Sequence, residues 1–148
     1  MAMVNSIKQT GIAVINDKSP IIDIMCNDLV RSGIDILFRS ENIESGLLKL
    51  SASEELPQAC VFYLDFSNNT ILAQLLELKL KYPAIKFIAH SDDDSEKAIS
   101  ALLEIGFDSY LLIGIDKEDF LTAIEGVCDG KKYFSTGISK IARKYFQK

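Results

Sequence analysis

Apolar residues follow two alternating patterns along this chain. Short unbroken runs, such as 59–64, are typical of strands that are buried on both faces of a sheet. Between these runs, apolar residues recur every three or four positions, which is typical of amphipathic helices. The unbroken runs predict five strands, over residues 11–15, 34–38, 59–64, 85–89 and 109–112.

Five helices are predicted between and after these strands, within residues 20–33, 42–53, 71–81, 92–106 and 116–130. Pro20, preceded by Ser19, is typical of a helix start, and Gly33 is typical of a helix end. The acidic run 92–94 favours the positive end of a helix dipole, so we expect the fourth helix to begin there. The first helix is expected to bury Ile21, Ile24, Met25, Cys26, Leu29 and Val30.

Strands that alternate with helices require parallel pairing and right-handed crossovers. The sequence therefore predicts an α/β fold, a doubly wound five-stranded parallel sheet in the order 2-1-3-4-5 with helices on both faces. Residues 1–10 are interpreted as a polar lead-in, 11–134 as the single domain and 135–148 as a C-terminal amphipathic helix.

Composition narrows the class of protein. The 148 residues suffice for one domain, and 48% hydrophobic with 25% charged residues is ordinary for a globular protein. A net charge of −5 argues against a nucleic-acid surface over the whole chain. No apolar run reaches the roughly 20 residues of a membrane span, and the N-terminus lacks an apolar signal core, so we expect a cytoplasmic protein. Cys26, Cys60 and Cys128 are expected to be free thiols.

Polar side chains follow the central strands of the predicted sheet. The carboxyl ends of parallel strands share one edge, which brings together Asn16, Asp17, Asp65, His90 and Ser91. Two neighbouring carboxylates repel unless a cation lies between them, and Mg²⁺ prefers such oxygen ligands. Aspartate can also act as a nucleophile toward phosphoryl groups. The Ser91 hydroxyl could then donate a hydrogen bond to an oxyanion formed on Asp65. The alternative is that these residues only cap strand ends.

Four segments carry a resemblance to a known family: 61–67, 82–88, 106–112 and 116–135. In their order and spacing they resemble the receiver domain of two-component response regulators, of the kind that precedes a helix-turn-helix output domain. The resemblance covers about residues 10–135 and implies a flavodoxin-like, CheY-like fold, a role in phosphorelay signal transduction rather than enzymatic catalysis, and a histidine kinase or another signalling protein as partner.

The resemblance also implies roles for particular residues. Asp65 matches the aspartate that accepts the phosphoryl group, and Ser91 matches the switch hydroxyl. Tyr110 matches the aromatic switch residue on the fifth strand. Asp17, Asp65 and the backbone carbonyl of Ser67 match the Mg²⁺ ligands.

The sequence departs from the family pattern at three places. Asn16 replaces the second acid of the metal site, so one negative charge is missing. Ile113 replaces the lysine that pairs with the phosphoryl oxygens, a charge-assisted bond worth about 1.5–3 kcal/mol. In the resembling family a longer loop that contains Pro and Gly flanks the acceptor, and here residues 68–70 replace it with a loop shorter by about two residues.

Two residues near the site, Lys18 and His90, are candidates to replace the missing lysine. Lys18 is better interpreted as a solvated surface residue. His90 precedes Ser91 and should point to the opposite face of the strand, where a buried or rim position is expected. The loop of Ile113 and Ile115 either forms an exposed contact surface for a protein partner or packs onto the fifth helix.

The C-terminal helix has one apolar stripe and a basic remainder. The stripe docks either on the domain or on a second subunit, and the basic face is interpreted as solvated. The chain ends before the further residues that a helix-turn-helix would need, so we expect contact with DNA only through an output domain that lies outside it.

The hypothesis that follows is a degenerate receiver, or pseudo-receiver, that acts through protein contacts and forms a homodimer. The main alternative is a conventional phosphoacceptor that is phosphorylated on Asp65 with Mg²⁺. A small hydrolase or flavin-binding protein of the same topology is the third reading, but the sequence has no Gly-rich phosphate loop and no nucleophile–histidine–acid set.

Overall fold

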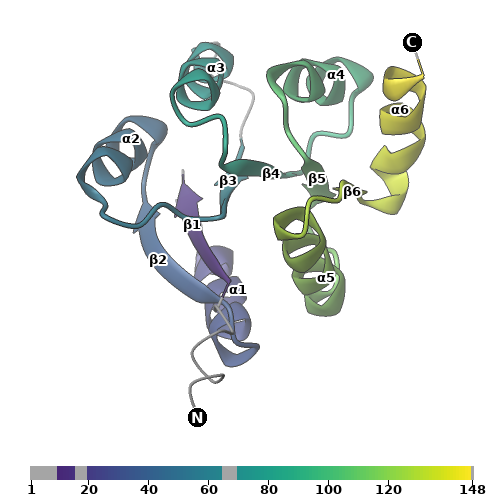
Figure 1. Cartoon of the computed structure of the whole chain (residues 1–148). Helices are drawn as coiled ribbons and strands as arrows, with labels where there is room; N and C mark the ends of the chain where they lie inside the picture. The colour runs from purple at the N-terminus through teal and green to yellow at the C-terminus, as the bar shows by residue number, and fades with distance from the viewer. Residues whose placement is uncertain (1–9, 16–19, 65–69, 148) are drawn as a thin grey trace.

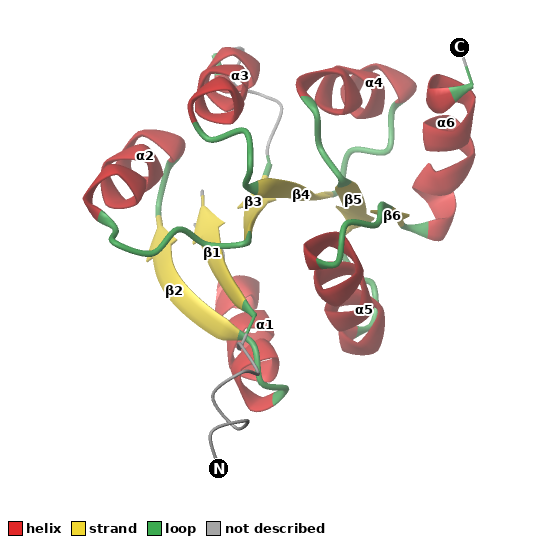
Figure 2. Cartoon of the chain, in the orientation of Figure 1, coloured by secondary structure: helices red, strands yellow, loops and turns green. Residues whose placement is uncertain are grey.

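The sheet of this protein is parallel throughout and lies between two layers of helices. The computed structural model describes residues 10–15, 20–64 and 70–147. Six strands pair in the order β2-β1-β3-β4-β5-β6, and every pair is parallel (Figures 1 and 2). The predicted α/β fold and the order of its five long strands are confirmed.

The bounds of the elements follow the predicted pattern closely. The strands are β1 Gly11–Ile15, β2 Asp35–Ser40, β3 Ala59–Tyr63, β4 Lys86–Ser91, β5 Ser109–Leu112 and β6 Tyr133–Phe134. The helices are α1 Pro20–Arg31, α2 Ile43–Ala52, α3 Ile71–Lys81, α4 Glu96–Ile105, α5 Lys117–Cys128 and α6 Thr136–Phe146. None of the helices in the described ranges combines the length and the apolar character that a membrane crossing requires.

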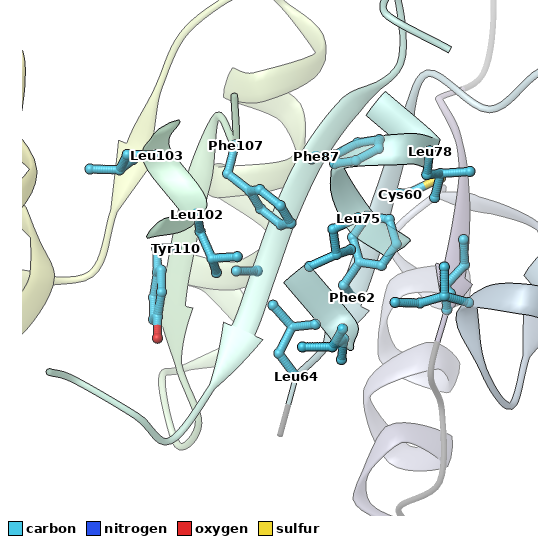
Figure 3. Close-up of a cluster of buried hydrophobic side chains, with 14 of the residues drawn as sticks. Cys60, Phe62, Leu64, Leu75, Leu78, Phe87, Leu102, Leu103, Phe107 and Tyr110 are labelled. Atoms are coloured by element: carbon cyan, nitrogen blue, oxygen red, sulfur yellow. The ribbon is translucent and has the colours of Figure 1, made fainter. Parts of the chain in front are cut away.

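The larger core lies between the sheet and α2, α3, α4 and α6. In Figure 1 the first three of these helices cover one face of the sheet, and α6 lies beside α4. Figure 3 shows Phe62, Phe87 and Phe107 at the centre of this core. The rings of Phe62 and Phe87 lie 4.8 Å apart between centroids, and those of Phe87 and Phe107 lie 5.3 Å apart. Such tilted and edge-on pairs add to the stabilisation from burial alone.

The smaller core lies on the opposite face, under α1 and α5 (Figure 1). Successive residues of the central strands alternate between the two cores: on β1, Ile12 and Val14 enter the smaller core, whereas Ala13 and Ile15 enter the larger one. This alternation explains why the central strands are unbroken apolar runs, since both faces are covered. Cys26 and Cys60 are buried, Cys128 is half-buried, and all three are free thiols, as expected.

Two details of the prediction were wrong. The fourth helix does not begin in the acidic run, because β4 extends to Ser91 and Ser95 is the N-cap, whose hydroxyl accepts a hydrogen bond from the Ala98 amide at 3.2 Å. On α1, Ile24 and Val30 are 66% and 56% exposed, so they lie outside the buried stripe. The helix needs only one narrow apolar face against the sheet edge, and these two residues fall beside it.

The C-terminal segment adds an edge strand that the sequence pattern did not predict. Tyr133 and Phe134 pair with Ser109 and Tyr110 as β6. Two residues are too few for a recognisable alternation, so only the structure reveals them. After this strand α6 turns back, and Ile138 and Ala142 are fully buried against the larger core. The stripe of α6 therefore docks on its own domain, which was one of the two alternatives.

Candidate functional site

The carboxyl ends of the central strands meet at one edge of the sheet. The Leu64 amide, directly after β3, donates a hydrogen bond to the His90 carbonyl on β4 at 3.0 Å. The Ile113 amide, directly after β5, donates to the Ser91 carbonyl at 3.0 Å. The chain is thus held in register up to the last residue before Asp65. Five residues discussed for this edge lie outside the described residues: Asn16, Asp17, Lys18, Asp65 and Ser67.

Ser91 ends β4 and is fully buried. Its side chain lies on the same face of the sheet as Tyr110. Each of the two residues has a strand neighbour, His90 or Leu111, that points to the opposite face, where the smaller core lies. The Ser91 hydroxyl oxygen accepts a hydrogen bond from the Asp93 amide at 3.1 Å. This hydroxyl therefore anchors the start of the loop between β4 and α4.

Tyr110 on β5 is also fully buried, with its phenol pointing along the sheet toward the same loop (Figure 3). Its hydroxyl donates a short hydrogen bond to the Asp93 carbonyl. Burial raises the pKa of Tyr110 to about 12, and a side-chain hydrogen bond with Ser91 acts in the opposite direction. Tyr110, Ser91 and the backbone of Asp93 thus form one linked group, and the two predicted switch residues are brought together.

His90 points to the opposite face, as the alternation along β4 predicts. The ring is only 4% exposed and packs edge-on against Phe120 of α5, with the centroids 5.1 Å apart, and against Tyr63 at 6.0 Å. Burial lowers the pKa of His90 to about 4, so the imidazole is neutral near pH 7. The prediction of a buried histidine is confirmed, and its position on the other face separates it from Ser91 and Tyr110.

A groove of about 240 Å³ runs between α1 and α5 beneath the loop that follows β5. Ile113, Gly114 and Ile115 line it from the loop, and His90 and Phe120 line it from inside. Ile113 and Ile115 are half-buried, and Ile115 packs against the smaller core. Of the two alternatives for this loop, Ile115 fits the one in which the side chain packs beside the fifth helix. Ile113 instead lines the groove.

Of the three acidic residues in the β4–α4 loop, Asp93 has a partner within the loop itself. The Asp93 carboxylate accepts a hydrogen bond from the Ser95 amide at 2.9 Å, and Asp92 and Asp94 are exposed. Among the described residues, no group of three or more acidic, histidine or cysteine side chains is arranged to hold a metal ion. The predicted Mg²⁺ ligands Asp17, Asp65 and Ser67 fall outside that part of the chain.

Sequence reasoning missed two features of this region. The bond from Tyr110 to the Asp93 carbonyl joins residues 17 positions apart through a backbone atom, which no residue pattern reports. The second feature is the groove, since His90 lies on β4 and Ile113 lies in the loop after β5, far apart in the sequence. Knowing that residues at alternate positions share one face of a strand would have placed both on the α1–α5 side.

Comparison with known proteins finds the same fold in solved receiver structures. No family model matches the sequence, and the search of curated proteins gave no match either. The isolated REC domain of RcsB from Salmonella enterica serovar Typhimurium, with the phosphomimetic BeF3⁻, superposes with a TM-score of 0.75 at 14% identity, over 91% of this chain and 99% of that chain. A LuxR-family two-component response regulator from Aurantimonas sp. superposes with a TM-score of 0.78 at 16% identity, over 94% and 99% of the two chains.

A third structure agrees with these two. The LuxR-family DNA-binding response regulator from Silicibacter pomeroyi gives a TM-score of 0.70 at 19% identity, over 85% of this chain and 96% of that chain. The chain therefore has the fold of response regulator receiver domains, and its own sheet includes the short edge strand β6, which is followed by α6. Identities this low establish the shared fold, and the function is a separate question.

Proposed function

We propose that this protein is the receiver domain of a two-component response regulator, and that it is an atypical receiver which signals through protein contacts. The receiver fold supports the first part, together with the order of Asp17, Asp65, Ser91 and Tyr110 along the chain. The observation that carries the second part is Ile113, an apolar residue in the loop after β5 whose side chain lines the α1–α5 groove.

The charge argument favours weak phosphorylation. A phosphoryl group on Asp65 would be dianionic, and a lysine in the loop after β5 would give it a charge-assisted hydrogen bond of about 1.5–3 kcal/mol. Ile113 can offer no such bond. Asn16 in place of an acid would also weaken a Mg²⁺ ion held by Asp17, Asp65 and the Ser67 carbonyl. Both changes lower the population of a phosphorylated state.

The Ser91–Tyr110 pair suggests how the domain would present itself to a partner. In a receiver that responds to phosphate, the hydroxyl at the end of β4 would turn toward the phosphoryl oxygens. Here that hydroxyl accepts from the Asp93 amide, and Tyr110 holds the carbonyl of the same residue. We infer that the β4–α4 loop is already fixed in one arrangement without a phosphoryl group, and that a signalling partner recognises this arrangement.

Partners are proposed on the same basis. A histidine kinase or another signalling protein would approach the carboxyl edge of the sheet, and a homodimer is the expected assembly. RcsB, a solved structure with the same fold, has been captured in a complex with DNA and as dimers bound to DNA. For the present chain, with its net charge of −5, we expect any contact with DNA to be made by a separate output domain.

The conventional alternative keeps Asp65 as a working phosphoacceptor. It is favoured by the presence of Asp17, Asp65 and Ser91 at matching positions. The experiment that separates the two is incubation with acetyl phosphate and Mg²⁺, followed by intact mass measurement. The proposal expects little or no added phosphoryl mass, and stoichiometric addition that Asp65→Asn abolishes would establish the conventional reading instead.

A further inference from the structure

Charge is divided unevenly along the chain. All 21 acidic residues lie within residues 1–129, whereas residues 130–148 hold six of the 16 basic residues. On α6, Lys140, Arg143 and Lys144 are exposed, and their spacing of three and four positions places them on one face of the helix. These three residues are called the basic row below.

The neighbouring helix α4 presents acidic side chains. Glu96 and Glu104 are exposed and eight positions apart, so they lie along one side of the helix and form an acidic row. Lys97 is turned away from Glu96 by about 100° around the helix axis and lies outside this row. α6 lies beside α4 (Figure 1), and the Lys144 Nζ atom is 3.4 Å from the Glu96 Oε1 atom. The two rows therefore adjoin at this ion pair.

Most charges of the two rows are not paired within the chain. In the part of the chain that the structure describes, Lys140, Arg143 and Glu104 form no ion pair. Like charges four positions apart, such as Lys140 and Lys144, slightly destabilise a helix. A basic helix face is often only solvated, but here a row of the opposite charge lies directly beside it.

We propose that two copies of this chain associate through the α4–α6 surface, so that the basic row of each copy faces the acidic row of the other. In a contact with two-fold symmetry both copies use the same surface, and adjacent rows of opposite charge then meet twice. A surface with a single sign of charge would instead repel its own copy.

The size of the surface indicates weak, reversible association. α4 and α6 have 10 and 11 residues, so each is about 15 Å long and about 10 Å wide. Together they offer less area than the roughly 800 Å² per partner that is typical of stable complexes. Half-buried apolar side chains on the same two helices, Ile105, Ile141 and Tyr145, are available to add contact.

The surface is connected to the candidate site through Tyr110. The Ser135 amide, at the start of α6, donates a hydrogen bond to the Tyr110 carbonyl at 3.1 Å, and the Tyr110 hydroxyl is bonded to the Asp93 carbonyl in the β4–α4 loop. A movement of this loop would shift α4 relative to α6 and would change the match between the rows. Association is a claim about the surface alone, whereas its use as a signal rests on the proposed receiver function.

The test is sedimentation equilibrium of the full chain, from about 20 μM to about 1 mM, in about 50 mM and about 500 mM NaCl. We expect a monomer–dimer equilibrium at the lower salt and an association constant about tenfold smaller at the higher salt, because salt screens exposed charges. Lys140→Glu/Arg143→Glu should lower the constant about tenfold or more, since each substitution acts twice across a two-fold axis. Lys81→Glu/Lys117→Glu makes the same change of charge on α3 and α5 and, as the matched control, should retain most of the association.

A charge exchange between the rows gives the sharpest readout. Glu96→Lys/Glu104→Lys reverses the acidic row and should also stay monomeric. Its net charge rises from −5 to −1, since each Glu→Lys change adds two charges, so overall repulsion would not explain this loss. Mixed in equal amounts, the two row variants should associate again, because a basic row then faces an acidic row at both contacts.

Several results would overturn the inference. A parent protein that stays monomeric at the lower salt would exclude this dimer, and binding of a short DNA duplex by that monomer through the basic row would assign a different partner. Equal losses in the row variants and the control, or a mixture that stays monomeric, would exclude the α4–α6 surface. These readouts do not depend on phosphorylation of Asp65, so failure here leaves the proposed receiver function to its own test.

Discussion

The Tyr110 hydroxyl on β5 is hydrogen-bonded to the main-chain carbonyl of Asp93, in the loop that leads into α4. The fully buried Tyr110 side chain thereby fixes the loop between β4 and α4. The Ser91 hydroxyl, at the end of β4, accepts a hydrogen bond from the amide of the same Asp93. The loop beside the candidate site is therefore tied to β4 and β5 through both the backbone amide and the backbone carbonyl of Asp93. Its conformation depends on the packing of β4 and β5.

Tyr110→Phe should loosen this loop while leaving the ring in the core. The Asp93 carbonyl would lose its partner, so we expect the free energy of unfolding to fall by about 1–2 kcal/mol, together with faster hydrogen exchange at the Asp93 and Ser95 amides. Urea denaturation and amide exchange measure the two effects. Tyr82→Phe is the matched control, since its half-buried hydroxyl makes no side-chain hydrogen bond within the described structure; an equal loss in both variants would contradict the role of Tyr110.

His90 should make the protein less stable in mild acid. Burial lowers its pKa from 6.5 to about 4, so the unfolded chain takes up the proton first as the pH falls. Unfolding therefore binds a proton between these two pKa values, and the free energy of unfolding decreases on going from neutral pH toward pH 4. Between pH ~7.5 and ~5.5 this one group should account for about 1 kcal/mol.

The comparison that isolates this contribution uses His90→Phe, which keeps an aromatic ring beside Phe120 and has no titrating group. Denaturant midpoints measured at both pH values should show a smaller acid-induced loss in the variant than in the parent protein. Parallel losses in the two proteins would mean that the ring already accepts a proton in the folded state.

Docking of α6 can be tested by truncating one buried side chain. Ile138 is fully buried against the larger core, so Ile138→Ala should lower the free energy of unfolding by about 2–4 kcal/mol. Ile24→Ala makes the same chemical change on a side chain that is 66% exposed, and should cost no more than about 0.5 kcal/mol. Similar values for both variants would show that α6 contributes little to the stability of the domain.

Restoring a cation in the loop after β5 should restore reactivity at Asp65. Ile113→Lys is expected to raise the yield of phosphorylation by acetyl phosphate about tenfold or more, the effect of one charge-assisted hydrogen bond. Ile115→Lys, two positions further along the same loop, serves as the control for a general change of charge. If both variants gain equally, or neither gains, the explanation based on position 113 fails.

The sequence alone was sufficient for most of the fold, because each central strand is apolar on both faces and each helix has its own end signals. Gly106, for example, ends α4 in the left-handed conformation with a φ of 115°, as its position predicts. The prediction erred at Asp92–Asp94, where acidic residues resembled a first helical turn although Ser95 provides the actual cap. It also missed β6, whose two residues pair only because β5 is an available edge.

The candidate site was predictable to a lesser degree. Alternation along β4 placed Ser91 and His90 on opposite faces correctly, because it is a local property of one strand. The contact between Tyr110 and the Asp93 carbonyl depends on how β4, β5 and the loop between β4 and α4 pack, which is not encoded in any local pattern. The same holds for the groove, where residues from α1, β4, α5 and a loop meet.

The account depends most on whether this receiver fold still responds to a phosphoryl group, and a titration with beryllofluoride and Mg²⁺ measures that directly. We predict that the amide signals of Ser91, Asp93 and Tyr110 in a ¹⁵N NMR spectrum stay where they are, because no cation from position 113 holds the mimic and the loop is already bonded. Saturable shifts of these three signals at one equivalent, lost in Asp65→Asn, would contradict the proposal and identify a conventional phosphoacceptor.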